Sequence, residues 1–235
     1  MYKGTADLSH QKLKQPGREF VWAYLSSRGV TSADVDMWQL GFAVPSDDLS
    51  RGLWHRVTIP VQSLHGQVLS VSGRAIPGYA TEYPDPYWHI PFRKSSVLFG
   101  LYQAVDYIVG RGYAILVEGQ FDVISMHRSG YQNTVGCLGI ELDHAGQQAR
   151  LLTRYTERVL ILPDPGPKAW EKAKGSARTL ARNFVQAALP QNALWFDPDE
   201  ACRRQPGAIR VAVQHFEKAV APSILESKWR RRHDS

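Results

Sequence analysis

Cysteine is scarce in this sequence. Cys137 and Cys202 are the only two cysteines among 235 residues, so the chain has neither a disulfide framework nor a CxxC zinc site. It also lacks any run near the roughly 20 apolar residues that a membrane-spanning helix needs. The first 20 residues hold no apolar segment of signal-peptide length, and the GxxxxGK(S/T) motif of P-loop ATPases is missing. We therefore expect a soluble intracellular protein that carries no zinc and contacts no membrane.

Most of the chain also lacks an excess of either sign of charge. The total of 28 Lys+Arg against 22 Asp+Glu gives a net charge of +6. Residues 201–235 hold eight of the basic residues and three of the acidic ones, so residues 1–200 are nearly neutral, with 20 against 19. A basic excess points mildly to a polyanionic partner. The basic C-terminal end is therefore either a solvated terminus or an attachment to DNA, and both interpretations stay open.

The first half of the chain predicts a small α+β region. Residues 1–18 are polar and are expected to be loose. Residues 19–30 predict a helix that stops at Gly29, and Thr31 or Ser32 is suited to cap a second short helix. Two β-rich runs, HRVTIPV and QVLSVSGRAI, lie within residues 54–76 and predict a hairpin. Residues 77–96, with four prolines, predict a long loop.

The second half alternates short apolar runs with helical patterns. AILVE, NTVGCLG, RVLILPD and NALWFD predict strands. The segments between them predict helices, the last of which is expected over residues 168–189. Strands that alternate with helices favour a parallel, doubly wound sheet.

Acidic residues follow three of these predicted strands. They are Glu118, Asp122, Asp164, Asp197 and Asp199. Ligands of such sheets bind at the carboxyl ends of the strands, and carboxylates suit Mg²⁺ or Mn²⁺ in phosphoryl transfer. Each acid taken alone is as well explained as a helix N-cap or a first-turn charge. Three strand ends in succession favour the metal site.

Basic and aromatic side chains offer candidate contacts to a nucleic acid. Arg56 and Arg74 lie in predicted strands, where phosphate contact and a solvated face are both open. Tyr83 is suited either to stack on a base or to anchor its loop. Lys168, close behind Asp164, faces either a triphosphate or water, whereas Lys172 and Lys174 are interpreted as a solvated helix face.

The series of motifs resembles a known family. Glu118-Gly119-Gln120-Phe121-Asp122 resembles the EGxxD element of the Toprim fold, which is shared by DnaG-like primases, topoisomerases and some nucleases. Segments 24–43, 55–76, 92–104, 137–152 and 196–207 resemble primase motifs in colinear order. The resemblance implies an α/β fold, with a Toprim-type parallel sheet flanked by helices and a smaller α+β primase-specific subdomain before it. The expected domains are a loose N-terminus at 1–18, this subdomain at 19–108, the Toprim domain at 109–200 and a basic helical segment at 201–235.

The resemblance also implies a function and a site. A primase core makes short RNA primers on single-stranded DNA from nucleoside triphosphates, a DNA-directed nucleotidyl transfer. The expected catalytic residues are Glu118, Asp122 and Asp164. The expected ligands of two Mg²⁺ or Mn²⁺ ions are Glu118, Asp164, Asp197 and Asp199. The expected contacts to template or nucleotide are Arg56, Arg74, Lys94, Lys168 and Tyr83.

One departure from the family pattern opens alternatives. The family's DxD metal motif reads Asp164-Pro165-Gly166 here, so the second carboxylate is replaced by glycine. The chain then resembles either a minimal catalytic core of phage or mobile-element type, or a degenerate DNA-binding replication module. A Toprim nuclease is a weaker alternative. A replicative helicase and a separate zinc-binding module are the implied partners, and a bacterial cytoplasm is the implied location.

Overall fold

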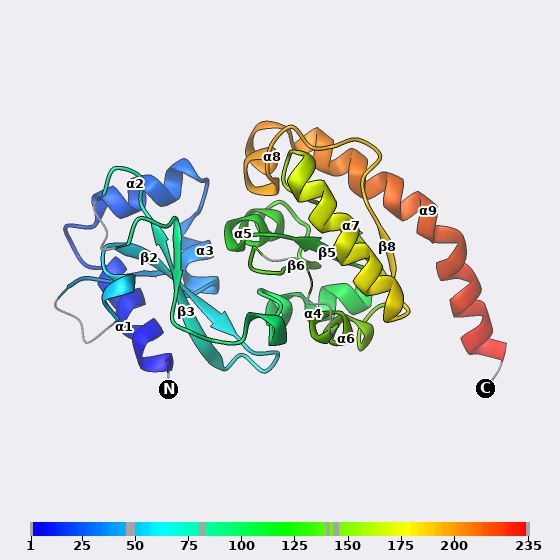
Figure 1. Cartoon of the computed structure of the whole chain (residues 1–235), viewed down its shortest axis with the longest axis horizontal. Helices are drawn as coiled ribbons and strands as arrows, with labels where there is room; N and C mark the ends of the chain where they lie inside the picture. The colour runs from blue at the N-terminus through cyan, green and yellow to red at the C-terminus, as the bar shows by residue number, and fades with distance from the viewer. Residues whose placement is uncertain (1, 46–49, 80–82, 140–141, 143–145, 234–235) are drawn as a thin grey trace. The chain divides into compact units, whose positions relative to one another are not determined.

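The computed structural model describes residues 2–45, 50–79, 83–139, 142 and 146–233 (Figure 1). The chain divides into two compact units, Met1–Tyr102 and Gln103–Ser235, here named the N-terminal unit and the C-terminal unit. Each unit contains its own four-stranded sheet. Of the helices in the described ranges, none combines the length and the apolar character of a membrane-spanning segment.

Three helices open the N-terminal unit: α1 (Lys3–Leu13), α2 (Glu19–Ser27) and α3 (Ser32–Met37). The expectation of a loose segment at 1–18 is wrong for α1, because Ala6, Ser9 and Leu13 form a buried face at helical spacing. This face rests on the first strand at Gly41, where any Cβ would collide with the backbone of α1. A short polar sequence therefore folds as a helix because tertiary packing covers its few apolar residues.

The next two helices follow the predicted signals. Gly29, after α2, has φ +73°, a left-handed conformation that glycine adopts without steric cost. Thr31 caps α3 in a capping box, in which its side chain accepts from the Asp34 N–H and the Asp34 carboxylate accepts from the Thr31 N–H. The predicted helix stop and helix cap are confirmed.

The N-terminal sheet is antiparallel, in the order β1-β2-β3-β4. Its strands are β1 (Gly41–Phe42), β2 (Arg56–Gln62), β3 (Val68–Ala75) and β4 (Tyr87–His89), with 3-10 turns η1 (Arg51–Leu53) and η2 (Lys94–Ser96). The predicted hairpin of β2 and β3 is confirmed. The segment predicted to be a loop at 77–96 contains β4, because three of its residues pair with β3.

The C-terminal unit has a parallel sheet in the order β6-β5-β7-β8, as the alternating pattern predicts. Its strands are β5 (Ala114–Val117), β6 (Thr134–Gly136), β7 (Arg158–Ile161) and β8 (Gln186–Ala188). Its helices are α4 (Leu101–Arg111, which begins in the N-terminal unit), α5 (Gln120–Arg128), α6 (Gln147–Thr153), α7 (Pro167–Arg182), α8 (Pro198–Arg204) and α9 (Pro206–His233). In Figure 1, α7 lies in front of this sheet.

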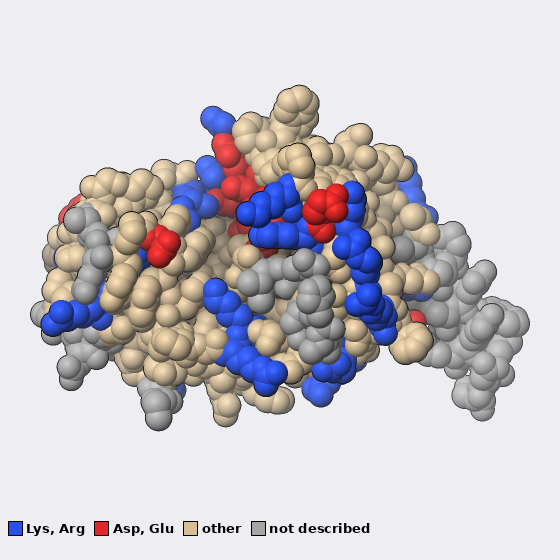
Figure 2. Space-filling view, viewed as in Figure 1, with Lys and Arg blue, Asp and Glu red and all other residues tan. Residues whose placement is uncertain are grey.

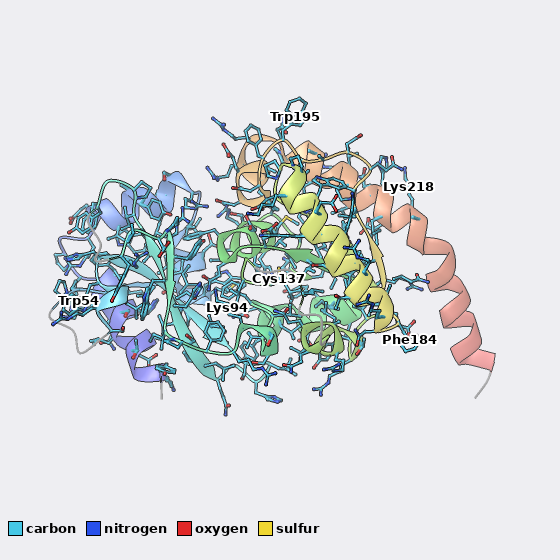
Figure 3. The ribbon with its side chains drawn as sticks, viewed as in Figure 1. Trp54, Lys94, Cys137, Phe184, Trp195 and Lys218 are labelled. Carbon is cyan, nitrogen blue, oxygen red and sulfur yellow. The ribbon has the colours of Figure 1, made fainter. Side chains whose placement is uncertain are left out.

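The last strand is not where the sequence predicts it. NALWFD, residues 192–197, forms no strand, and β8 instead lies inside the segment predicted as a helix. Helix α7 ends at Arg182, Phe184 takes a φ of +61°, and the chain then pairs with β7. Pairing with a buried strand overrides the helical propensity of an alanine-rich segment. The apolar run that suggested a strand is partly surface, since Trp195 is 81% exposed and points away from the unit (Figure 3).

Candidate active site

The carboxyl ends of β5, β6 and β7 meet at one edge of the parallel sheet. Val117 pairs with Gly136 and Leu116 with Ile161, so the residues that follow these strands lie next to one another. Glu118 follows β5, Cys137 follows β6 and Asp164 follows β7 by three residues. We call this region, with Glu118, Asp122, Asp164 and Asp197, the acidic edge. Ligands of open parallel sheets bind at the carboxyl ends of the strands, so the ligand site is expected there.

Glu118 lines a small cavity. Its Oε2 is 3.8 Å from Nζ of Lys172 on α7. The cavity is lined by these two side chains, Cys137 and Ser176, and by apolar residues of the strand ends and α7: Leu116, Val117, Ile161, Leu162, Pro163 and Ala173. The backbone of Glu118 is also fixed, because its carbonyl accepts from the N–H of Gly139. The carboxylate is therefore held at the edge between β5 and α7.

Asp122 organises the loop between β5 and α5. Its carboxylate accepts from the Gly119 N–H at 2.7 Å and from the Asp199 N–H at 3.1 Å. Glycine at 119 leaves room for this contact, because a Cβ there would lie 2.6 Å from Oδ2 of Asp122. Burial, followed by the negative charges of Asp164 and Asp197, raises the pKa of Asp122 to about 8, against the opposing effect of the two N–H donors. The buried Asp122 carboxylate therefore holds the backbone at Gly119 and Asp199 in place and does not face solvent.

Asp164 carries the least satisfied carboxylate of the acidic edge. Its Oδ1 is buried and has no hydrogen-bond partner among the described residues. Burial, and then the charges of Glu118 and Asp197, raise its pKa to about 7, while Lys172 opposes the shift. A buried oxygen with no donor, surrounded by like charges, is the environment that a cation relieves.

The two later acids do not end a strand, which corrects the prediction. Asp197 is the N-cap of α8, and its side chain accepts from the Glu200 N–H at 2.7 Å. Asp199 is buried, accepts from the Ser125 hydroxyl and pairs with Arg203 at 3.2 Å. The helix-cap interpretation therefore holds for Asp197. Asp199 is bound within the fold and is removed from the candidate metal ligands.

The remaining acids fit a divalent cation without forming a closed cage. Among the described residues, no group of three or more His, Cys, Asp or Glu side chains is close enough to hold a metal ion by itself. Yet Glu118 and Asp197 both raise the pKa of Asp164 through their charges, so the two carboxylates lie within electrostatic range of Asp164. Mg²⁺ is usually held by one or two carboxylates together with water and substrate phosphates. Glu118 and the unpaired oxygen of Asp164 suit this open arrangement.

Gly166, in place of a second DxD carboxylate, is required by its backbone conformation. It is the N-cap of α7 with φ +106° and ψ 159°, a region that is essentially restricted to glycine. Space is not the reason, since a Cβ there would meet nothing within 4 Å. The loss of the acid is therefore built into the path of the Pro165–Gly166–Pro167 turn.

Arg56 is a structural residue, which corrects the prediction that it contacts phosphate. Its side chain is fully buried on β2, and its guanidinium donates to the carbonyls of Tyr83 at 2.5 Å, Asp85 at 2.8 Å and Pro86 at 3.4 Å. Arg56 therefore fixes the position of the proline-rich segment before β4 through hydrogen bonds to its backbone. Gly73 makes room for it, because a Cβ there would lie 2.8 Å from Cδ of Arg56.

The other predicted contact residues lie nearer the surface. In the N-terminal unit, Arg74 lies 4.8 Å above the ring of Tyr87, and its Nε donates to the Tyr24 hydroxyl at 3.2 Å. Lys94 is half-buried in η2, and burial lowers its pKa. Tyr83 is 41% exposed and stacks on Trp88.

Lys168 lies in the C-terminal unit, exposed in the first turn of α7. Figure 2 shows Lys and Arg side chains along α7, with acidic side chains beside its N-terminal end. The sequence pattern predicted a solvated face for Lys172, but in the structure its ammonium forms an ion pair with the carboxylate of Glu118. The sequence did hold a signal for this position: Lys172 lies four residues after Lys168, so the two side chains share one face of the helix.

Comparison with known proteins agrees with this geometry. A family model described as a Toprim domain matches residues 112–201. The DNA primase of Aquifex aeolicus is 32% identical over 212 residues, which cover 75% of this chain and 41% of that one. The chain spans less than half the length of the first curated relatives it matches, with 41%, 25% and 39% of their lengths covered.

Solved structures show the same fold. The Aquifex aeolicus primase structure with zinc-binding and RNA polymerase domains has a TM-score of 0.77 and 26% identity, covering 95% of this chain and 63% of that one. A DnaG primase catalytic domain bound to single-stranded DNA has a TM-score of 0.77 and 21% identity, covering 94% and 81%. By sequence and by fold, the chain is therefore similar to the catalytic cores of DnaG-type DNA primases, and residues 112–201 match the Toprim domain.

Proposed function

We propose that this chain is a primase catalytic core that makes short RNA primers on single-stranded DNA from nucleoside triphosphates. The observation that carries the proposal is the buried oxygen of Asp164, which has no partner among the described residues and lies near Glu118 at the carboxyl edge of the parallel sheet. The relatives named DNA primase and the DnaG domain bound to single-stranded DNA support it.

Glu118 and Asp164 are the residues that would hold a divalent cation, Mg²⁺ or Mn²⁺, with Asp197 beside them. Such a cation supplies neutralising charge for the triphosphate and for the attacking hydroxyl oxygen. Asp122 serves this pair indirectly, because its hydrogen bonds to the N–H groups of Gly119 and Asp199 fix the loop that carries Glu118. We therefore assign Asp122 a positioning role.

The basic residues at the surface divide between the two units. Lys168, exposed in the first turn of α7, is suited to a triphosphate, because a helix N-terminus also attracts negative charge. In the N-terminal unit we assign template or nucleotide phosphates to Arg74 and Lys94, and base stacking to Tyr83. A replicative helicase and a separate zinc-binding module are the proposed protein partners.

The test is primer synthesis by the full chain on single-stranded DNA with labelled nucleotides and Mg²⁺ or Mn²⁺. Asp164→Asn and Glu118→Gln should each reduce the rate by about 100-fold or more, because each removes a charge that the transition state needs. Glu171→Gln is the matched control. Glu171 also lies on α7, but it forms its ion pair with Lys174 on the same helix and not with a residue of the acidic edge. Synthesis that survives both site substitutions would remove the acidic edge from the mechanism.

Gly166 favours a second candidate function, a DNA-binding replication module without catalysis. Its conformation excludes an ordinary side chain, so the missing second carboxylate is not easily regained. This candidate predicts salt-dependent binding of single-stranded DNA together with no nucleotide incorporation under any metal. The same assay therefore separates the two functions, provided that DNA binding is measured in parallel.

A further inference from the structure

Lys172 makes an ion pair of a kind that differs from its neighbours. Among the ion pairs described for the C-terminal unit, those of Lys174, Arg203 and Arg204 join residues three or four positions apart on one helix. Lys172 instead reaches from α7 to Glu118, which follows β5. Helical spacing cannot account for this contact, because the partners come from two elements on either side of the acidic edge.

The environment of Lys172 keeps its ammonium at that edge. Its side chain lines the same cavity as Glu118, together with Ile161 and Leu162 of the strand end. The side chains of Lys172 and Glu118 are 38% and 20% exposed, so the pair is partly shielded from water. The same positive charge acts on Asp164, whose pKa it lowers against the effect of burial.

The contribution of this pair to stability does not explain its position. A partly exposed pair at 3.8 Å is a weak source of folding free energy. A fixed positive charge among carboxylates has a larger effect on another cation, because like charges repel at short range in a poorly solvated site. The position of Lys172 therefore matters most for what the acidic edge binds.

We propose that Lys172 is a tethered cation of the acidic edge, which neutralises Glu118 so that the edge takes one divalent ion beside Asp164 instead of two. The inference rests on the proposed function, since it assumes a divalent ion at this edge. Lys172 acts through Glu118 and is a positioning residue. Its charge takes the place of a second ion at a site where Gly166 supplies no second carboxylate.

The test is a titration of the full chain with Mn²⁺, in which free Mn²⁺ is followed by electron paramagnetic resonance. Wild type should bind one ion at this edge, and Asp164→Asn should remove it. Lys172→Met keeps most of the side chain's length and loses its charge. It should bind a second ion or bind the first about tenfold more tightly, because the competing charge is gone.

Two control variants separate position from net charge. Lys174→Met removes the same charge from the same helix, but Lys174 pairs with Glu171 at 2.7 Å, away from Glu118. It should bind Mn²⁺ as wild type does. Lys172→Arg keeps the charge and should stay within about twofold of wild type. Circular dichroism melts of all four variants check that each is folded.

The outcomes separate this inference from the proposed function. Identical Mn²⁺ number and affinity in wild type and Lys172→Met would overturn the inference, even where wild type makes primers. An equal gain in Lys174→Met would also overturn it, because net charge would then explain the effect. A gain confined to Lys172→Met supports it, even where primer synthesis is absent. Failure of wild type to bind Mn²⁺ at all would overturn it as well.

Discussion

The two units of this protein bury charge in opposite ways. In the N-terminal unit, the fully buried cation of Arg56 donates to the backbone carbonyls of Tyr83, Asp85 and Pro86. In the C-terminal unit, the buried charges are carboxylates, and Asp164 keeps an oxygen without a donor among the described residues. Arg56 finds its partners inside its own unit, whereas Asp164 keeps an oxygen available.

This difference separates a structural charge from a functional one. Burying an ion is costly unless hydrogen bonds replace the water it loses. Arg56 meets that condition within its own unit through the hydrogen bonds of its two terminal nitrogens. Asp164 does not, and the pKa values of Asp164 and Asp122, raised to about 7 and about 8, report the unfavourable charge. The divalent cation that we propose at the acidic edge would supply the missing partner.

The largest effect that we expect tests the structural side of the comparison. Arg56→Met should reduce the free energy of unfolding by roughly 3 to 5 kcal/mol, because the fully buried Arg56 side chain loses its charged hydrogen bonds to the carbonyls of Tyr83, Asp85 and Pro86. Urea denaturation measures this loss. Arg51→Met is the control: Arg51 is exposed and lies 5.6 Å from the Trp54 ring, a contact of about 1 kcal/mol at most. If Arg56→Met stayed as stable as Arg51→Met but lost DNA binding, the original phosphate assignment would return.

A histidine in each unit extends the comparison to pH. Burial lowers the pKa of His127, in the C-terminal unit, to about 4, and its Nε2 lies 2.8 Å from the Thr134 carbonyl oxygen. Because the folded pKa is below the unfolded value of about 6.5, its contribution is complete above pH 6.5 and is lost as pH falls towards 4. The loss is up to about 3 kcal/mol.

His127→Gln should therefore flatten the decline of stability between pH 7 and pH 4, measured by urea denaturation at each pH. The corresponding residue in the N-terminal unit is His89, whose pKa is also lowered to about 4, by burial first and then by Lys94. His89 is only half-buried, so His89→Gln should change the slope less. Equal slopes in wild type and His127→Gln would mean that His127 already titrates normally.

The sequence predicted the parallel sheet well because its signals are local. AILVE and RVLILPD are apolar runs whose burial at the sheet centre matches their composition, and β5 and β7 lie there. β8 was misplaced because its three residues depend on pairing with β7, which no local pattern encodes. Helix α1 was missed for the same reason, since its stability comes from the packing of Ala6, Ser9 and Leu13.

The candidate site was predicted in type more than in detail. Glu118 and Asp164 were predicted to lie together because strand ends in a parallel sheet converge, and the structure places both at the acidic edge. Asp199 and Arg56 were assigned from predicted strand positions and the family resemblance, and their partners Ser125 and the carbonyls of residues 83–86 come from distant parts of the sequence. Hydrogen bonding across such separations decides whether a charge is structural or available, and composition does not reveal it.

The turn that replaces the second carboxylate gives the next smaller effect. Gly166→Ala should cost roughly 1 to 3 kcal/mol, because φ +106° is strained for any residue with a Cβ. Gly166→Asp should cost a similar amount and should not increase Mn²⁺ affinity, since the backbone must move to accept it. Gly110→Ala on α4 is the control; Gly110 has open space and no positive φ, so alanine should be neutral or slightly stabilising. A Gly166→Asp protein with full stability and tighter Mn²⁺ binding would show that the turn accepts the acid freely.

The smallest effect has the opposite sign to that of Arg56→Met and tests the comparison most directly. Asp164→Asn should stabilise the metal-free protein by about 1 to 2 kcal/mol at pH 8.5, after allowance for solvent screening, because it removes a charge that burial, Glu118 and Asp197 disfavour.

The pH dependence of that gain follows from the direction of the shift. The folded pKa of Asp164, about 7, lies above its usual 3.8, so the carboxylate costs stability increasingly as pH rises from 4 to 7. At pH 4.5 the group is protonated in the folded chain, and Asn should be nearly neutral. Urea denaturation in EDTA at both pH values measures the difference, and added Mn²⁺ should stabilise wild type but not the variant. A loss of stability at pH 8.5 would mean that Asp164 is satisfied as Arg56 is, because only a hydrogen-bonded buried charge makes its removal costly.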